Sequence, residues 1–364
     1  MYIHVGYHKT ATSLLQRQVF PKIKVAHESY PRVEKTVGYK SHKPRIRPSS
    51  KSIRVVRLFN CSPSVWNSKL GQRVLTSIIR RNKKHSQIII SDEDILGDLK
   101  RPNKYLPAEN IIDSIGAKYN LRWLPVSGYT RKSPNPHLFK DHLKNMKKVL
   151  RSLGVENLKI IVGIRRQDLL MASLYSQLSD RIWSASQKSF EEWVKNIISS
   201  SLDYYHGGGI HLDYHHNIDF MLRAVGEDNL LVLPVEMLKE KPKKYLYNLY
   251  LFLSLDYESD SFKNILQKIS HKPKKSNKSC RNTWNLKKLR SLYLLYSNKV
   301  ESSQTFGPTK RIPVRWFDWN RENKIHLRNG LRKKIRSKYE EGNKRLNNIL
   351  SDVDLSRYGY MHFS

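Results

Sequence analysis

A lysine and a run of hydroxyl side chains stand near the start of the chain, where an apolar segment gives way to a helical one. Lys9 and Thr10 lie in the stretch HVGYHKTATSLLQ, between the apolar residues 2–5 and a helix-like pattern that begins at Ser13. At such a junction, backbone N–H groups and the positive end of the helix dipole converge on one point. We therefore expect this loop to bind a phosphate or sulfate group.

The loop differs from the P-loop of nucleotide hydrolases, whose pattern is G-x-x-x-x-G-K-[ST]. Gly6 is present, but no second glycine precedes Lys9, and no strand-end aspartate for magnesium stands out. A P-loop-like kinase, which would need magnesium, is therefore the weaker alternative. A loop that binds phosphate or sulfate without a metal fits the pattern better.

A second set of groups suited to an anion stands in the middle of the chain. Arg165 directly follows the apolar run 158–164, and Ser173 comes eight positions later on a helical pattern. A guanidinium fork and a hydroxyl at a strand-to-helix junction can make charge-assisted hydrogen bonds to a dianionic phosphate. The chain therefore carries two candidate anion-binding elements.

The first of these elements resembles the 5′-phosphosulfate loop of sulfotransferases that use 3′-phosphoadenosine-5′-phosphosulfate (PAPS). In that family the pattern is a strand, then Lys-Thr-Gly-Thr-Thr or a close variant, then a helix. Here the loop reads Lys-Thr-Ala-Thr-Ser. The alanine forbids the most strained turn geometries but tolerates helical ones. The resemblance implies that Lys9 contacts the 5′-phosphate and the oxygen that bridges it to sulfur. It also implies hydroxyl and backbone donors from the rest of the loop: Thr10, Ala11, Thr12 and Ser13.

The second element resembles the 3′-phosphate site of the same family, and the resemblance implies that Arg165 and Ser173 bind that phosphate together. The form RRQDxxxxSLYxQ looks like that of bacterial carbohydrate sulfotransferases. Gln167 replaces the usual proline, and Leu170 stands where a second arginine is common. Arg166 is an alternative source of that missing charge.

The resemblance implies that an acceptor hydroxyl attacks the sulfur of PAPS while Lys9 stabilises the leaving oxygen. That hydroxyl needs a general base within reach. Glu93 is the first candidate, because it follows the buried run 87–91 in a stretch similar to the Ser-x-Glu of several carbohydrate sulfotransferases. His8 is the second. Alternatively, the acidic residues 92–94 cap the helix that follows them, and His8 packs within its loop.

The composition indicates a globular protein with an anionic partner. The chain has 364 residues, 39% of them hydrophobic, which is enough for a core. It has 67 Lys and Arg against 31 Asp and Glu, a net charge of +36. We expect a carbohydrate acceptor, either polysaccharide or glycolipid, whose acidic groups the basic surface would bind. A nucleic-acid-binding protein is the alternative, but it leaves both anion-binding elements unexplained and no nucleic-acid motif supports it.

Cysteines and hydropathy point to the cytoplasm. Cys61 and Cys280 are too few for a disulfide scaffold or a zinc site. No apolar run reaches the roughly 18 to 20 residues of a membrane span, and the N-terminus enters a strand without a signal peptide. We expect a cytoplasmic protein, or one peripheral at a membrane surface, that needs no metal. Four histidines show no metal-ligand pattern: His206, His211, His215 and His216.

Short apolar runs alternate with helical patterns, which indicates an α/β fold. Continuous apolar strands predict a three-layer, mainly parallel sheet flanked by helices. The resemblance implies a P-loop NTPase-like sulfotransferase fold. We also expect helices at 138–154, ended by Gly154, and at 243–255. The expected strands are 2–5, 53–59, 87–91, 158–164 and 229–236.

We expect a single domain over residues 1–364. Two regions lie outside the resemblance, a basic insertion at about 22–85 and a basic C-terminal extension from about 286; the insertion includes a surface loop at 29–52. The stretch 270–282 is either a lid over the nucleotide or a solvated run of charge. Three aromatic residues of the tail either pack on the core or stack on sugar rings: Trp316, Phe317 and Trp319.

Overall fold

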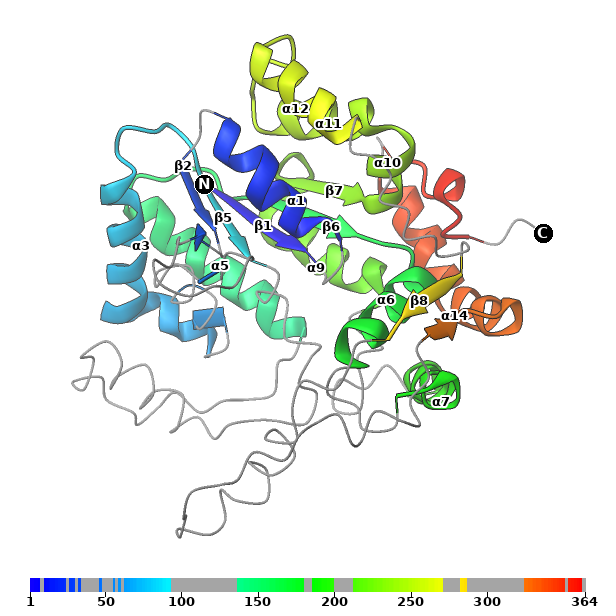
Figure 1. Ribbon diagram of the computed structural model, residues 1–364. Coiled ribbons are helices and arrows are strands. Elements are labelled where there is room, and N and C mark those ends of the chain that lie inside the picture. The colour runs from blue at the N-terminus through cyan, green and yellow to red at the C-terminus, as the bar shows by residue number, and fades with distance from the viewer. Residues whose placement is uncertain are drawn as a thin grey trace, which may run out of the picture.

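The computed structural model contains a central parallel sheet of five strands in the order β2-β5-β1-β6-β7, with helices on both faces (Figure 1). This confirms the expected three-layer α/β fold. The strands are Tyr2–Gly6 (β1), Ala26–Ser29 (β2), Ile88–Asp92 (β5), Lys159–Ile164 (β6) and Leu230–Pro234 (β7). The structure describes residues 1–6, 10–23, 26–29, 32–33, 46–47, 55, 58–59, 62–92, 136–179, 185–199, 212–270, 282–286, 324–350 and 353–361.

Strand β1 lies at the centre of the sheet and pairs with β5 on one side and β6 on the other. In this register Val5 is the partner of Asp92, and Gly6 is the partner of Gly163. Because all five strands are parallel, their carboxyl ends meet at one edge of the sheet, where ligands bind in folds of this class. The carboxyl ends of β1, β5 and β6 therefore lie side by side at this edge.

Four of the five expected strands are present, as β1, β5, β6 and β7. The expectation of a strand at 53–59 is wrong, since Val55, Leu58 and Phe59 are helical and buried. A short apolar run has the same composition in a buried helix as in a buried strand, so periodicity alone could not separate them. The outer strand is instead β2, whose sequence AHES gives no apolar signal. Within the expected loop 29–52, two short strands pair antiparallel: Arg32–Val33 (β3) and Ile46–Arg47 (β4).

Helices make up both outer layers. The expected helix at 138–154 is confirmed as α5, and Gly154 after its end has a φ of +78°. The helices are Thr12–Leu14 (α1), Lys69–Arg81 (α3), Pro136–Ser152 (α5), Gln167–Leu178 (α6), Gln187–Ser199 (α7), Tyr214–Val225 (α9), Val235–Glu240 (α10), Pro242–Phe252 (α11, also expected), Asp260–Ser270 (α12) and Asn329–Ile349 (α14).

Short elements complete the described fold. The π-helical turn η1 continues α1 without a break, and strands β8 and β9 pair antiparallel. Their bounds are Leu15–Val19 (η1), Phe20–Lys22 (η2), Pro63–Asn67 (η3), Glu227–Asn229 (η5), Ser356–Tyr358 (η7), Thr283–Asn285 (β8) and Lys324–His326 (β9).

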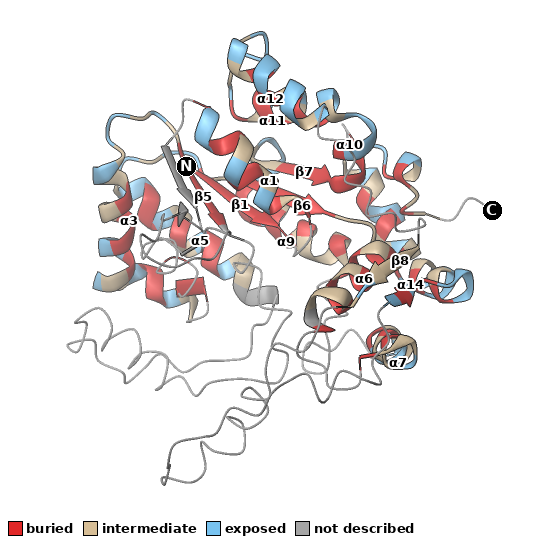
Figure 2. Cartoon of the chain, in the orientation of Figure 1, coloured by how far each residue is buried: buried red, intermediate tan, exposed pale blue. Residues whose placement is uncertain are grey.

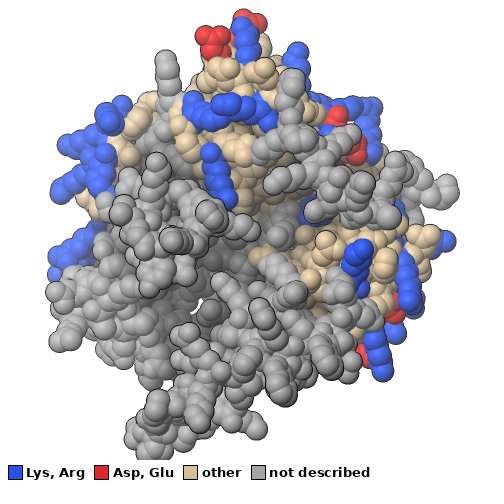
Figure 3. All heavy atoms as spheres, viewed as in Figure 1, with Lys and Arg blue, Asp and Glu red and all other residues tan. Residues whose placement is uncertain are grey.

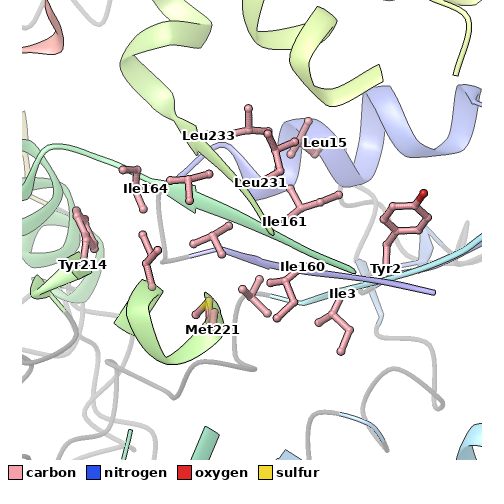
Figure 4. Close-up of a cluster of buried hydrophobic side chains, with 14 of the residues drawn as sticks. Tyr2, Ile3, Leu15, Ile160, Ile161, Ile164, Tyr214, Met221, Leu231 and Leu233 are labelled. Atoms are coloured by element: carbon pink, nitrogen blue, oxygen red, sulfur yellow. The ribbon is translucent and has the colours of Figure 1, made fainter. Parts of the chain in front are cut away.

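The core fills the space between the sheet and both helical layers. Strands β1, β6 and β7 are buried over nearly their whole length (Figure 2). Leu15 and Leu231 lie on one side of the strands, and Ile160 and Met221 lie on the other (Figure 4). Alternate side chains of each strand thus enter different layers, which holds the carboxyl edge of the sheet rigid.

Candidate active site

Two glycines paired across β1 and β6 leave room for the loop that follows β1. Thr10 is fully buried against them. A Cβ atom at Gly6 would lie 2.8 Å from the Thr10 hydroxyl, and one at Gly163 would lie 2.9 Å from it. A Cβ at Gly6 would also collide with the hydroxyl of Thr12. Any side chain at either glycine would therefore push the loop off the sheet, a role for Gly163 that the sequence did not indicate.

The turn into the helix passes through a left-handed residue. Ala11 has φ 63° and ψ 10°, and its carbonyl accepts the N–H groups of Leu14 (2.8 Å) and Leu15 (3.1 Å). Left-handed backbone costs a residue with a Cβ roughly 1–2 kcal/mol. The expectation that alanine excludes strained turn geometries is therefore wrong, because Ala11 takes the left-handed backbone that the family's glycine would adopt without strain.

The Thr12 hydroxyl is a buried donor with no hydrogen-bond partner among the described residues. Thr12 itself is 2% exposed. A buried polar group without a partner costs about 1–3 kcal/mol, so a ligand atom that accepted a hydrogen bond from it would stabilise the site. A phosphate or sulfate oxygen meets that requirement. Ser13 follows on the exposed side of the same turn.

Arg165 leaves β6 two residues after Gly163, so its backbone lies close to the loop at Thr10. The Tyr214 hydroxyl donates to the Arg165 carbonyl at 2.5 Å and holds the strand end. Burial lowers the pKa of Arg165, and the carboxylate of Glu236 opposes that shift. Burial and the charge of Arg165 likewise lower the pKa of Lys239. Half-buried Arg165 and the exposed Lys239 therefore share this corner, which favours binding of an anion.

Glu236 stabilises the same corner from α10. Its two carboxylate oxygens accept from the backbone N–H of Arg166 (3.3 Å) and from the hydroxyl of Tyr360 (2.9 Å). Both oxygens are thus occupied, and Glu236 is buried. The sequence placed a glutamate near the last strand of the sheet but gave no sign of these partners.

Asp168, in the first turn of α6, is fully buried and contacts three arginines. Arg166 binds it through two parallel hydrogen bonds of 2.7 and 3.1 Å. From α14, Arg332 and Arg336 approach the same carboxylate at 3.3 and 3.5 Å. Arg166 is therefore engaged with Asp168, which argues against the idea that it replaces the missing second arginine at Leu170. Leu170 is fully buried in the core, where a guanidinium would have no room.

Gln167 joins α6 to α14 through an amide pair. Its side chain donates to Asn343 (2.8 Å) and to the Leu212 carbonyl (3.1 Å), while Asn343 donates back to it at 3.2 Å. Asn343 also donates to the carbonyl of Tyr360 at 2.9 Å. The residue that departs from the family's proline thus ties three segments together beside Arg165.

Ser173 lies half-buried on α6, two turns beyond Arg165. On the next turn Ser176 donates to the Asn285 carbonyl at 2.6 Å, which places β8 beside this part of the helix. The structure therefore places Thr10 against β6, close to the end of the strand that Arg165 follows, and Ser173 two helical turns farther along α6.

A buried polar network lies beneath the loop. The His4 ring and the Ser91 hydroxyl are 2.6 Å apart, and the Gln16 amide donates to the hydroxyl and carbonyl of Ser91 at 3.1 Å each. Gln16 belongs to the π-helical turn η1, a distortion that is frequent at functional sites. The network fixes the end of β5, the strand that leads to Glu93. Three predicted residues lie outside the described residues: His8, Lys9 and Glu93.

Several other expectations concern residues that the structure does not describe. These are residues 271–281 of the candidate lid, the first two histidines of the 206–216 cluster, and the tail aromatics Trp316, Phe317 and Trp319. His216 is described and packs edge-on against Phe220, at 4.5 Å between ring centres. The described residues contain no group of three or more metal-ligating side chains. No helix among them is long and apolar enough to span a membrane.

Comparison with known proteins adds a family assignment. A model of the sulfotransferase domain matches residues 121–347, which include Arg165 and Ser173. Among solved structures, the chain is similar to the sulfotransferase domain of the olefin synthase from Synechococcus PCC 7002. The two sequences are 13% identical, the match covers 75% of this chain and 82% of that chain, and the TM-score is 0.33. It is also similar to the sulfotransferase STF9 from Mycobacterium avium, with 12% identity, coverages of 75% and 68%, and a TM-score of 0.29. No curated protein matches it.

Proposed function

The chain belongs to the sulfotransferase domain family, and we propose that it transfers the sulfuryl group of PAPS to a hydroxyl of a carbohydrate acceptor. Sulfotransferases of this family generally use PAPS as donor. In the reaction an O–S bond forms to the acceptor oxygen, and the S–O bond to the 5′-phosphate breaks. The acceptor's proton passes to a general base, and adenosine 3′,5′-bisphosphate (PAP) leaves.

The meeting of the two anion-binding elements is the observation that carries this proposal. Thr10 packs on Gly163, and Arg165 comes two residues later, directly after the end of that strand. This contact between segments far apart in the sequence supports the proposal that the two motifs belong to one site. A donor with phosphates at both its 5′ and 3′ positions needs two such anion sites side by side.

The loop suits the 5′-phosphosulfate end of the donor. The Thr12 hydroxyl is buried and has no partner among the described residues. In the proposal it donates to a phosphate or sulfate oxygen, with Thr10, Ala11 and Ser13 shaping the turn around it. Lys9 would stabilise the negative charge that develops on the leaving oxygen.

Arg165 and Ser173 suit the 3′-phosphate. The Arg165 carbonyl is fixed by Tyr214, and the N–H of the next residue is fixed by Glu236. These contacts hold the backbone at Arg165 in place before any ligand binds. Preorganised cations stabilise a dianion better than mobile ones, because less conformational entropy is lost on binding.

Glu93 is our first candidate for the general base and His8 the second. Support for Glu93 comes from β5, whose last residues pair with β1 beside the loop. A base there would lie at the same sheet edge as the anion sites, where an acceptor hydroxyl must approach. We expect Glu93→Gln to lose turnover while PAP affinity stays unchanged. Wild-type turnover in that variant would exclude Glu93 as the base.

The nucleotide site is tested by calorimetric titration with PAP in the presence of EDTA. The wild type should bind saturably, and AMP, which lacks the 3′-phosphate, should bind more weakly. Arg165→Gln should bind PAP at least about tenfold more weakly, since a charge-assisted hydrogen bond contributes about 1.5–3 kcal/mol. Arg345→Gln removes an equal charge from an exposed position on α14 and serves as the matched control. Absence of PAP binding by folded wild type would refute the proposed site.

The carbohydrate acceptor is tested separately, with PAPS and a panel of acceptors. The resemblance to bacterial carbohydrate sulfotransferases and the net charge of +36 support a glycan with acidic groups. Transfer to polysaccharide or glycolipid hydroxyls is expected. Transfer to small alcohols or phenols with none to any glycan would overturn this part of the proposal and leave the donor site intact.

A further inference from the structure

Helices α3 and α5 carry a one-sided excess of positive charge. From residue 62 to residue 91 the chain contains no Asp or Glu, and α5 contains a single carboxylate, Asp141. Six exposed cations lie on α3 and the turn that follows it: Lys69, Arg73, Arg80, Arg81, Lys83 and Lys84.

Both helices are anchored to the same short turn, η3. Gly71 of α3 packs directly on the backbone of Trp66. The Trp66 indole donates to His142 of α5 at 2.9 Å, and Asn145 of α5 donates to the Pro63 carbonyl at 3.0 Å. The two helices are therefore held together through one turn, and their charges lie on neighbouring elements.

The exposed cations of α5 lie along one face of that helix. Lys144, Lys148 and Arg151 follow at intervals of four and three residues, which places them above one another on its surface. Together with the six cations of α3 and its following turn they form what we call the α3–α5 basic surface. Blue side chains over α3 stand along the left edge of the molecule in Figure 3, without red ones among them.

On two other helices, some surface cations pair with carboxylates one turn away. Arg223 pairs with Asp219 on α9 at 2.8 Å, and on α14 Lys344 and Arg345 pair with Glu340 and Glu341 at 3.1 and 3.0 Å. Helix α3 has no carboxylate that could do the same. Its like charges repel one another, and a bound polyanion would relieve that repulsion.

We propose that the α3–α5 basic surface binds an acidic polysaccharide, so that a long acceptor chain is held on the enzyme outside the reaction site. This inference rests on the proposed function, because it takes the acceptor to be a glycan. Polysaccharide fits this surface better than membrane or single-stranded nucleic acid. Those partners use exposed apolar or aromatic side chains beside the cations. Among the described residues, the large hydrophobic side chains that are exposed lie elsewhere, on α11 and in the segment that follows it: Tyr247, Leu251 and Tyr257.

Three triple variants of the full-length protein test the assignment, each lowering the net charge equally. The first changes Arg80, Lys83 and Lys84 to Gln, and the second changes Lys144, Lys148 and Arg151 to Gln. The matched control changes three exposed lysines of α14 to Gln: Lys333, Lys334 and Lys338. Binding to dextran sulfate is measured against salt concentration, with neutral dextran, phosphatidylserine vesicles and single-stranded DNA as comparison probes.

We expect the wild type to bind dextran sulfate and not neutral dextran. Each ionic contact with a polyanion adds roughly 0.7–0.9 to the slope with which the logarithm of the affinity falls against the logarithm of the salt concentration. Loss of three contacts should therefore weaken binding at least about tenfold at 0.15 M salt. The α14 control should bind like the wild type. PAP affinity should stay unchanged in all three variants, which separates failure of this inference from failure of the nucleotide site.

Three outcomes would overturn the inference. The first is wild-type protein that binds PAP but not dextran sulfate. The second is an equal loss of affinity in all three variants, which would mean that only net charge matters. The third is tighter binding to vesicles or DNA with the same sensitivity to the α3 and α5 changes, which would assign the surface to another class of partner.

Discussion

Replacing Gly163 by alanine should displace the loop that we assign to the donor. Its Cβ atom would lie 2.9 Å from the Thr10 hydroxyl and 3.0 Å from the Thr10 carbonyl oxygen. Ordinary contacts of a Cβ begin at about 3.4 Å, so the loop must move by several tenths of an ångström or the strand must give way. Because one of the two contacts is with backbone, a simple rotamer change of Thr10 cannot relieve it.

The expected magnitude follows from this overlap. Overpacking a tight contact costs about 1–3 kcal/mol, and alanine recovers roughly 0.5–1 kcal/mol relative to glycine in a strand. If the loop holds its place, the free energy of unfolding falls by about 1–2 kcal/mol. If the loop moves, that cost appears as a loss of PAP affinity of about tenfold for each 1.4 kcal/mol.

Urea denaturation and calorimetric titration with PAP together measure both parts. Gly330→Ala is the matched control, because a Cβ there meets no atom within 4 Å. Because Gly330 lies in α14, alanine there should leave PAP affinity unchanged and raise the free energy of unfolding by up to about 1 kcal/mol. Wild-type stability combined with wild-type PAP affinity in Gly163→Ala would show that the loop does not rest on β6, and the proposed donor site would fail with it.

Three further substitutions test the contacts around the site. Ala11→Gly should raise the free energy of unfolding by about 0.5–1 kcal/mol in urea, since glycine adopts the left-handed backbone without strain; a loss of stability would contradict that backbone. Asn343→Leu leaves the buried amide of Gln167 without its partner and should lower stability by about 1–3 kcal/mol, and an unchanged urea midpoint would count against the amide pair. Asp168→Asn removes the buried carboxylate shared by three arginines and should lower the free energy of unfolding by about 3–5 kcal/mol. Asp219→Asn, at an exposed ion pair, should change it by less than about 1 kcal/mol. Equal effects would contradict the burial of Asp168.

The sequence alone was enough for the layered architecture and for most of the sheet. Ile- and Val-rich runs such as that of β6 are typical of strands buried on both faces, and a series of them predicts a parallel sheet. The prediction failed at two places, where the apolar signal was ambiguous and where a strand carried no such signal. Residues 53–59 have the apolar character of a strand but are helical where described, and β2 forms an outer strand from AHES because it pairs with β5.

The sequence by itself also determined which side chains could bind an anion, because Lys9, Thr12, Arg165 and Ser173 have the required charges and hydroxyls. Only the tertiary structure decided that the two elements meet. That meeting depends on the pairing of Gly6 with Gly163, which lets Thr10 pack where a side chain would otherwise stand. Likewise, the contacts of Asp168 and Gln167 with α14 join residues separated by more than 160 positions. Spacing along the chain cannot reveal such contacts, because packing creates them between distant segments.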